Sequence, residues 1–266
     1  MSHSLNLFDE LVNLMESLRD PEAGCPWDRV QTFKTIAPYT IEEAYEVEDA
    51  IDRGNMEDLK EELGDLLFQV IFHAQMAHEQ GAFDLQDVAT SLIDKMHRRH
   101  PHIFGDAQVD TTGQVNDNWE AIKAEERQSK NYTSLMDDVP LNLTALTRAL
   151  KLQKRAARVG FDWPDAAPII EKLHEELAEF EAELEPASPN PDRLEDELGD
   201  LLFVVVNLAR VHGVDPETAL RRTNRKFVSR FHYMEKQGSN LTDLSLAELE
   251  TLWQKAKREE NSGGSN

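Results

Sequence analysis

Four carboxylate pairs with a spacing of three residues, two in each half of this sequence, are the side chains best suited to chemistry. Residues three apart project from one face of a helix, so two neighbouring helices, each with one pair, can bring four carboxylates to one point. Mg²⁺ prefers such hard oxygen ligands and binds through few carboxylates together with substrate phosphates. The pattern therefore predicts magnesium sites built from these pairs: Glu43 and Glu46, Glu62 and Asp65, Glu176 and Glu179, Glu197 and Asp200.

The four pairs belong to two copies of one unit. The segment 62–68, Glu-Leu-Gly-Asp-Leu-Leu-Phe, recurs without change at 197–203, an offset of 135. The acidic segment 42–46 matches 175–179, and all four tryptophans pair at similar offsets: Trp27 with Trp163, and Trp119 with Trp253. A single acidic pair on a helix is usually solvated surface. In this sequence the same four positions are acidic in both copies, beside an unchanged apolar frame, which favours a site instead.

The elements that position these carboxylates are expected to be helices throughout, with no strands. One stripe of apolar residues recurs at helical spacing and is predicted to face the core: Leu63, Leu66, Leu67, Val70, Ile71 and Ala74. Gly54 suits a helix end and Asn55 a helix start, and Asn190 before Pro191 marks a second start. Residues 105–114 are predicted to form a loop, followed by a helix from Trp119 to Lys130.

The domain organisation follows from the duplication. We expect an N-terminal helical domain over 1–130, a linker over 131–142, a C-terminal helical domain over 143–260 and a disordered tail over 261–266. The longer connection between acidic helices in the second copy, 186–191 against 52–55 in the first, explains the small drift in offset.

Composition excludes several classes of protein. The 266 residues carry a formal net charge of −23, which argues against nucleic-acid binding because a basic surface supplies most of that affinity. Cys25 is the single cysteine, so no intrachain disulfide forms and a reducing cytoplasm is expected. The N-terminus lacks the features of a signal peptide, and the apolar-rich stretch 66–78 is too short to span a bilayer. We expect a cytoplasmic protein without a membrane partner.

The acidic pattern, Glu-Glu-x-x-Glu followed by Glu-x-x-Asp after a short loop, resembles the MazG family of nucleoside triphosphate pyrophosphohydrolases. The resemblance covers nearly the whole chain, from Phe8 to about Glu260, and includes three further segments: Cys-Pro-Trp-Asp at 25–28, His-Pro-His-Ile-Phe at 100–104 and Gly-Phe-Asp-Trp at 160–163. It implies a tandem, all-α architecture of helical bundles, usually a homodimer. It also implies Mg²⁺-dependent hydrolysis of nucleoside triphosphates, ATP among them, to the monophosphate and pyrophosphate, with broad base specificity.

We assign the main active site to the second copy. Its metal ligands are expected to be Glu176, Glu179, Glu197 and Asp200, with Glu175 as the general base or a partner of the ligands. A triphosphate also needs cationic donors. Lys172 lies four residues before Glu176 and Arg193 four before Glu197, so each can flank the carboxylates.

The other substrate-binding candidates lie further along the second copy. Arg222, Lys226 and Arg230 recur at four-residue steps, and the stretch resembles the family's Asn-x-Lys-Phe, which implies Asn224 and Lys226 near the phosphates. Trp253 and Lys257 lie one helical turn apart, so an indole could stack on a base while the ammonium meets phosphate. A solvated basic face and core packing of Trp253 are the simpler alternatives.

The first copy departs from this pattern, because its nearest equivalent, 95–102, lacks the Asn-x-Lys pair and contains Pro101, which is expected to end a helix. Its three histidines, His97, His100 and His102, match no closed zinc site. A di-iron bundle requires two Glu-x-x-His motifs, and only 171–174 supplies one near the acidic pairs. The remaining alternative to an enzyme is a non-catalytic acidic helical module for dimerisation or regulation.

Overall fold

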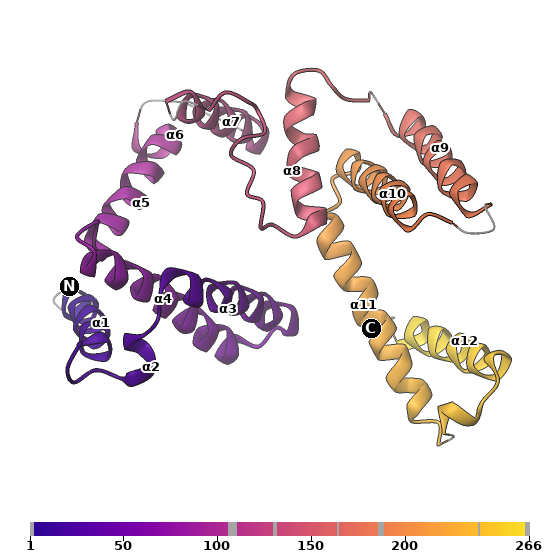
Figure 1. Cartoon of the computed structure of the whole chain (residues 1–266), viewed down its shortest axis with the longest axis horizontal. Coiled ribbons are helices and arrows are strands. Elements are labelled where there is room, and N and C mark those ends of the chain that lie inside the picture. The colour runs from indigo at the N-terminus through magenta and orange to yellow at the C-terminus, as the bar shows by residue number, and fades with distance from the viewer. Residues whose placement is uncertain are drawn as a thin grey trace. The chain divides into compact units, whose positions relative to one another are not determined.

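The computed structural model describes residues 3–105, 111–129, 132–163, 165–185, 189–238 and 240–263. Within these ranges the chain is helical and contains no strand, as the sequence predicts. The helices form two compact units that divide between Ala124 and Glu125, here called unit 1 and unit 2. Each unit contains one copy of the repeated sequence. Figure 1 shows the helices of both units coloured from the N- to the C-terminus.

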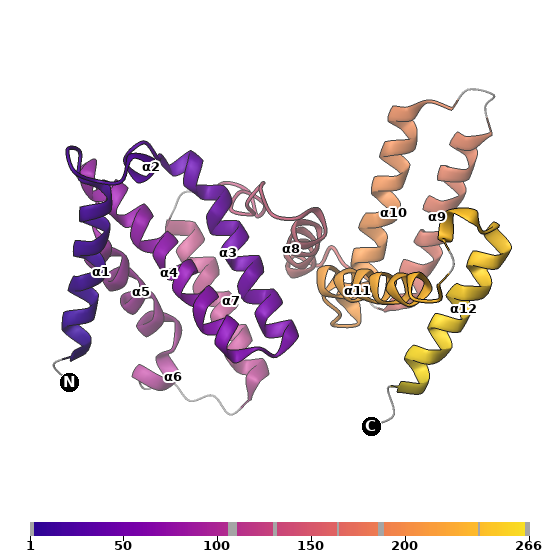
Figure 2. The same cartoon turned by 90° about the horizontal axis from the view of Figure 1, so that it is seen from below.

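Unit 1 is built around two long antiparallel helices, α3 and α4, which lie side by side (Figures 1 and 2). Helices α1 and α5 contact α4, and the short α2 precedes α3. The bounds are α1 (His3–Arg19), α2 (Pro26–Arg29), α3 (Phe33–Arg53), α4 (Met56–Glu79), α5 (Leu85–Arg99), α6 (Pro101–Phe104) and α7 (Thr112–Ser129), the last of which crosses the division between the units.

Unit 2 repeats the central hairpin as α9 and α10 and adds a second hairpin, α11 with α12 (Figures 1 and 2). Helix α8 contacts both α10 and α11 and so joins the two hairpins. The bounds are α8 (Ala145–Arg158), α9 (Ala166–Leu184), α10 (Pro191–Val211), α11 (Pro216–Glu235), the 3-10 turn η1 (Leu241–Asp243) and α12 (Leu246–Gly263).

The ends of the acidic helices follow the expected capping chemistry. Gly54 ends α3 in the left-handed conformation, with φ of 66°, which costs glycine little because it has no Cβ. The Asn55 side chain then accepts from the backbone N–H of Glu57 and Asp58 at the start of α4. Asn190 caps α10 in the same way, with Pro191 at the first helical position. Helix α5 ends at Arg99, two residues before Pro101, which begins α6.

The predicted boundary between loop and helix in residues 105–119 is wrong. The loop expected over 105–114 gives way to helix at Thr112, well before Trp119. The cause is a reciprocal cap: the Gln114 N–H donates to Thr111 Oγ1 at 3.3 Å, and the Thr111 N–H donates to Gln114 Oε1 at 3.2 Å. Residues 106–110 and 130–131, which belong to the expected loop, helix and linker, lie outside the described residues.

The core of unit 1 lies where α1 and α5 cover the C-terminal half of α4. Its buried members are Met15, Ile36, Ile71, Phe72, Ala74, Met76 and Leu85. Ile71 and Ala74 of the predicted core stripe belong to this cluster, but Leu63, Leu67 and Val70 are 50 %, 47 % and 38 % exposed. The prediction is wrong for these three, which precede the buried members of the cluster on α4; those begin at Ile71.

Among the described residues, no helix is both long and apolar enough to cross a membrane. Helix α12 extends to Gly263, and residues 264–266 of the expected tail lie outside the described residues.

Candidate active site

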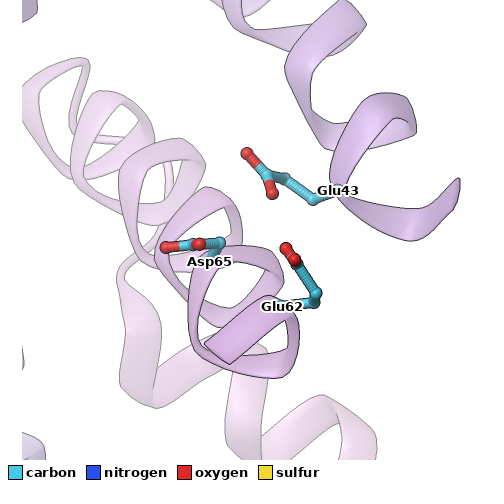
Figure 3. Close-up of side chains that lie close together, drawn as sticks. All are labelled: Glu43, Glu62 and Asp65. Carbon is cyan, nitrogen blue, oxygen red and sulfur yellow. The ribbon is translucent and has the colours of Figure 1, made fainter. Parts of the chain in front are cut away.

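The hairpin of α3 and α4 brings carboxylates together in unit 1. Glu43 on α3 faces Glu62 and Asp65 on α4, and each offers an oxygen within 4.8 Å of the others (Figure 3). Glu62 and Asp65 lie on one face of α4 because they are three residues apart. Glu46 also contacts Glu43 through a side-chain hydrogen bond. The four carboxylates predicted for the first copy thus include three that can share one cation.

The unit 1 carboxylates repel one another. Partial burial raises the pKa of Glu43, and a hydrogen bond that its protonated form donates to Glu46, with the charges of Glu46, Asp65 and Glu62, raises it further. Burial likewise raises the pKa of Glu62, with the charges of Glu46, Asp65 and Asp58 adding to the effect. A divalent cation among these oxygens would remove the repulsion.

The hairpin of α9 and α10 forms the equivalent group in unit 2. Glu176 and Glu179 on α9 and Glu197 on α10 each offer an oxygen within 4.8 Å of the others. Glu176 is 5 % exposed, whereas Glu179 is exposed and Glu197 is half-buried. Desolvation raises the pKa of Glu179, helped by the charges of Glu176 and Glu197. Asp200 follows Glu197 by one turn of α10 and is exposed.

Two cations flank the unit 2 carboxylates at the positions that the sequence suggests. Lys172 Nζ lies 2.6 Å from Glu176 Oε1 and 2.8 Å from Glu175 Oε1, and these contacts raise the pKa of Lys172. Arg193 Nη2 lies 2.7 Å from Glu183 Oε1 and 3.6 Å from Glu197 Oε1. The acidic site of unit 2 is therefore bordered by positive charge on both of its helices.

Glu183 is a site neighbour that sequence reasoning missed. It pairs with Arg193 and so shares this guanidinium with Glu197. Its spacing carried the signal, since Glu183 lies four residues after Glu179, on the same side of α9.

The remaining predicted substrate-binding residues lie on the other hairpin of unit 2. On α11, Arg222 and Asn224 are exposed and Lys226 is half-buried. Arg230 pairs with Glu260 of α12 at 2.7 Å, and its guanidinium lies 5.5 Å from the Trp253 ring centroid. Trp253 also packs on Phe227, with ring centroids 5.1 Å apart, while Lys257 follows one turn later on α12. In this chain the contacts of Trp253 join α11 to α12.

The histidines of unit 1 form an aromatic cluster with Trp119. The His100 ring lies 5.2 Å from the Trp119 ring and 5.7 Å from the His102 ring, and His97 packs against Phe104 at 4.5 Å. His100 Nδ1 lies 2.8 Å from the Met96 carbonyl oxygen and donates to it. In the part of the chain that the structure describes, neither group of clustered metal-binding side chains includes a histidine.

The fold and the site together define a class: an all-helical protein with two copies of a carboxylate-bearing helical hairpin. Comparison with known proteins agrees, because the model of the MazG nucleotide pyrophosphohydrolase domain matches this chain twice, at residues 31–104 and 166–234. Each match contains one acidic hairpin. The chain belongs to the MazG family.

Two relatives are similar over nearly their whole length. The chain is 50 % identical to the nucleoside triphosphate pyrophosphohydrolase of Escherichia coli (strain K12) over 260 residues, which cover 96 % of this chain and 99 % of the relative. It is 48 % identical to the nucleoside triphosphate pyrophosphohydrolase/pyrophosphatase MazG of Thermotoga maritima over 255 residues, which cover 94 % and 96 % of the two chains.

Proposed function

We propose that this protein hydrolyses nucleoside triphosphates to nucleoside monophosphates and pyrophosphate, with Mg²⁺ and with broad base specificity. The observation that carries the proposal is the unit 2 carboxylate group with cations on both of its helices. The names of both relatives and of the matching family support the same reaction.

The donors fit Mg²⁺, because Glu176, Glu179 and Glu197 present hard oxygen ligands close enough to share one ion. These three residues, with Asp200, would hold the metal. When bound, Mg²⁺ would supply positive charge against the phosphate oxygens and the charge that develops on the leaving group. The raised pKa of Glu179 fits this assignment, since the uncompensated carboxylates favour a proton or a cation.

The chain's own side chains then bind and orient the substrate. Lys172 and Arg193, at opposite helices of the hairpin, are positioned to exchange their carboxylate partners for phosphate oxygens. A water oxygen bonds to the α-phosphorus, the bond from that phosphorus to the bridging oxygen breaks, and pyrophosphate leaves. The proton of the water passes to Glu175, which precedes the expected ligands on α9 and whose carboxylate, before substrate binds, lies 2.8 Å from Lys172 Nζ. We assign Arg222, Asn224, Lys226, Arg230, Trp253 and Lys257 to the outer part of the substrate site.

A homodimer is also part of the proposal. The same three positions of the second acidic helix are exposed and apolar in both copies: Leu63, Leu67 and Val70 on α4, and Leu198, Leu202 and Val205 on α10. Apolar faces repeated in this way favour burial against a second chain. We further propose the domains 1–130 and 143–260, joined by the linker 131–142.

Product analysis tests the reaction. All eight common nucleoside triphosphates are incubated with Mg²⁺ and with chelator, using the native protein and the matched variants Glu179→Gln and Glu46→Gln. We expect monophosphate and pyrophosphate, abolished by chelator and by Glu179→Gln, with Glu46→Gln close to native. Diphosphate and phosphate as products would mean that a different bond is cleaved. Absence of turnover would favour the non-catalytic module.

Light scattering coupled to size exclusion tests the dimer. At micromolar concentration the native chain is expected at twice the monomer mass of 30.3 kDa, and a monomer would contradict the proposal. Leu67→Glu and Leu202→Glu identify which apolar face is used, because a buried glutamate disfavours association.

A further inference from the structure

A cavity of about 450 Å³ lies in unit 1 between α1, α4 and α5, away from the carboxylate hairpin. Its floor is apolar and is formed by buried core residues, Ile71, Ala74 and Leu85. Carboxylates from two of the three helical segments line its walls: Asp9 and Glu16 from α1, and Asp84 at the start of α5. Its volume lies in the range of small-molecule sites.

The cavity is separate from the proposed metal sites. Ile71 follows Glu62 by nine residues on α4, which at 3.6 residues per turn is two and a half turns, so the two residues lie on opposite sides of the helix. The same nine residues correspond to about 13 Å along the axis. A molecule in the cavity would therefore touch neither Glu62 nor Asp65.

The charge of the lining defines what the cavity can accept. It contains three carboxylates and one imidazole, that of His78, and, among the described residues, no lysine or arginine. Asp84 is engaged as the cap of α5, where it accepts from the Asp87 N–H at 2.9 Å. Asp9 and Glu16 are exposed and lie seven residues apart on α1, which is two turns or about 10 Å along the axis.

We propose that this cavity binds a small aliphatic polyamine, with ammonium groups on Asp9 and Glu16 and its methylene chain on the apolar floor. The two carboxylates suit two separate cationic groups on one molecule, and the floor between them suits hydrocarbon. Phosphate groups without a bound metal ion are repelled by the carboxylates, which disfavours a free nucleotide. A hydrated divalent cation gains nothing from the apolar floor. The net charge of −23 raises the concentration of such cations near the protein.

Calorimetric titration of the full chain with spermidine, without nucleotide or divalent cation, tests the site. The double variant Asp9→Asn/Glu16→Gln is compared with Glu10→Gln/Asp94→Asn, which removes two exposed charges of unit 1 outside the cavity. We expect one saturable site per chain. Its affinity falls about tenfold in the first variant, because two ion pairs are lost, and stays within about twofold in the second.

A third variant adds a positive charge to the cavity instead of removing negative ones. Gln86 also lines the cavity and is exposed, so Gln86→Lys places an ammonium near the same carboxylates and is expected to compete with spermidine, again weakening binding about tenfold. Equal weakening in both double variants would reveal general attraction to an acidic protein and overturn the proposal. Absence of a saturable site in the native chain, or equal binding of 1,8-octanediol, would also overturn it. A basic peptide that binds where spermidine does not would assign the cavity to a protein partner.

Discussion

The two acidic hairpins share their carboxylates but not their cations. In unit 2, Lys172 and Arg193 contact the carboxylate group from both helices. The offsets of the repeat put Tyr39 and Asp58 at these positions in unit 1. Asp58 adds negative charge and pairs with Arg53 at the edge of the hairpin instead. Unit 1 therefore keeps the carboxylates that we propose bind metal, whereas the two cations that we propose bind phosphate are replaced at the matching positions.

The largest expected effect comes from removing a cation of unit 2. Lys172→Met should lower kcat/KM for triphosphate hydrolysis about 100-fold, because the variant loses a charged donor to the phosphate oxygens. Steady-state kinetics on two different triphosphates measures it. Lys60→Met, an exposed lysine on the hairpin of unit 1, is the control and should change little. Equal losses of kcat/KM in both variants would contradict the assignment of the reaction to unit 2 alone.

Placing the equivalent cations in unit 1 should have a smaller effect, which is an increase in nucleotide affinity. In a Glu179→Gln background, Tyr39→Lys/Asp58→Arg should strengthen nucleotide binding about tenfold, since two favourable contacts replace one repulsion. Equilibrium binding of a non-hydrolysable triphosphate with Mg²⁺ gives the comparison, and Tyr39→Met/Asp58→Asn is the matched control. Unchanged affinity would show that unit 1 lacks more than these two charges.

The next prediction concerns the stability of unit 1, where the side chain of Arg19 links the end of α1 to the end of α4. Arg19 makes a two-pronged ion pair with Glu79, with both N–O distances 2.7 Å, and donates to the Asp28 carbonyl at 2.6 Å. Its guanidinium also lies 5.2 Å from the Phe72 ring centroid. Arg19→Met should lower the free energy of unfolding of unit 1 by about 1–2 kcal/mol, measured by denaturant titration. Arg29→Met, at an exposed position of α2, should cost less.

The smallest effect concerns the pH dependence of the unit 1 carboxylates. The native structure raises the pKa of Glu43, so ionising this group costs more in the folded state than in the unfolded state. Stability is therefore lost as pH rises from the ordinary value of 4.5 through the raised pKa. In chelator, Glu43→Gln should melt about 1–2 °C above native at pH 8 and at the same temperature at pH 4. A variant that melts lower at pH 8 would contradict the repulsion.

Local chemistry was readable from the sequence, and packing was not. Gly54, Asn55 and Asn190 were predicted correctly because a cap depends on a few adjacent residues. The start of α7 was missed although Thr111 and Gln114 carry a capping signal. Periodicity placed Leu63 and Leu67 on an apolar face, yet it could not show that this part of α4 lies outside the buried core cluster. The convergence of three carboxylates in each hairpin agrees with their spacing, while their role in catalysis stays a prediction.

Each carboxylate group is drawn from two helices that follow one another in the chain, and this has a consequence for folding. Closing the short connection at Gly54 costs little loop entropy, and contacts between neighbouring segments form quickly compared with distant ones. Both hairpins can therefore assemble early, before the helices that flank them are in place. A cation present at that stage would favour the hairpin over the open chain, so metal should accelerate refolding as well as stabilise the product.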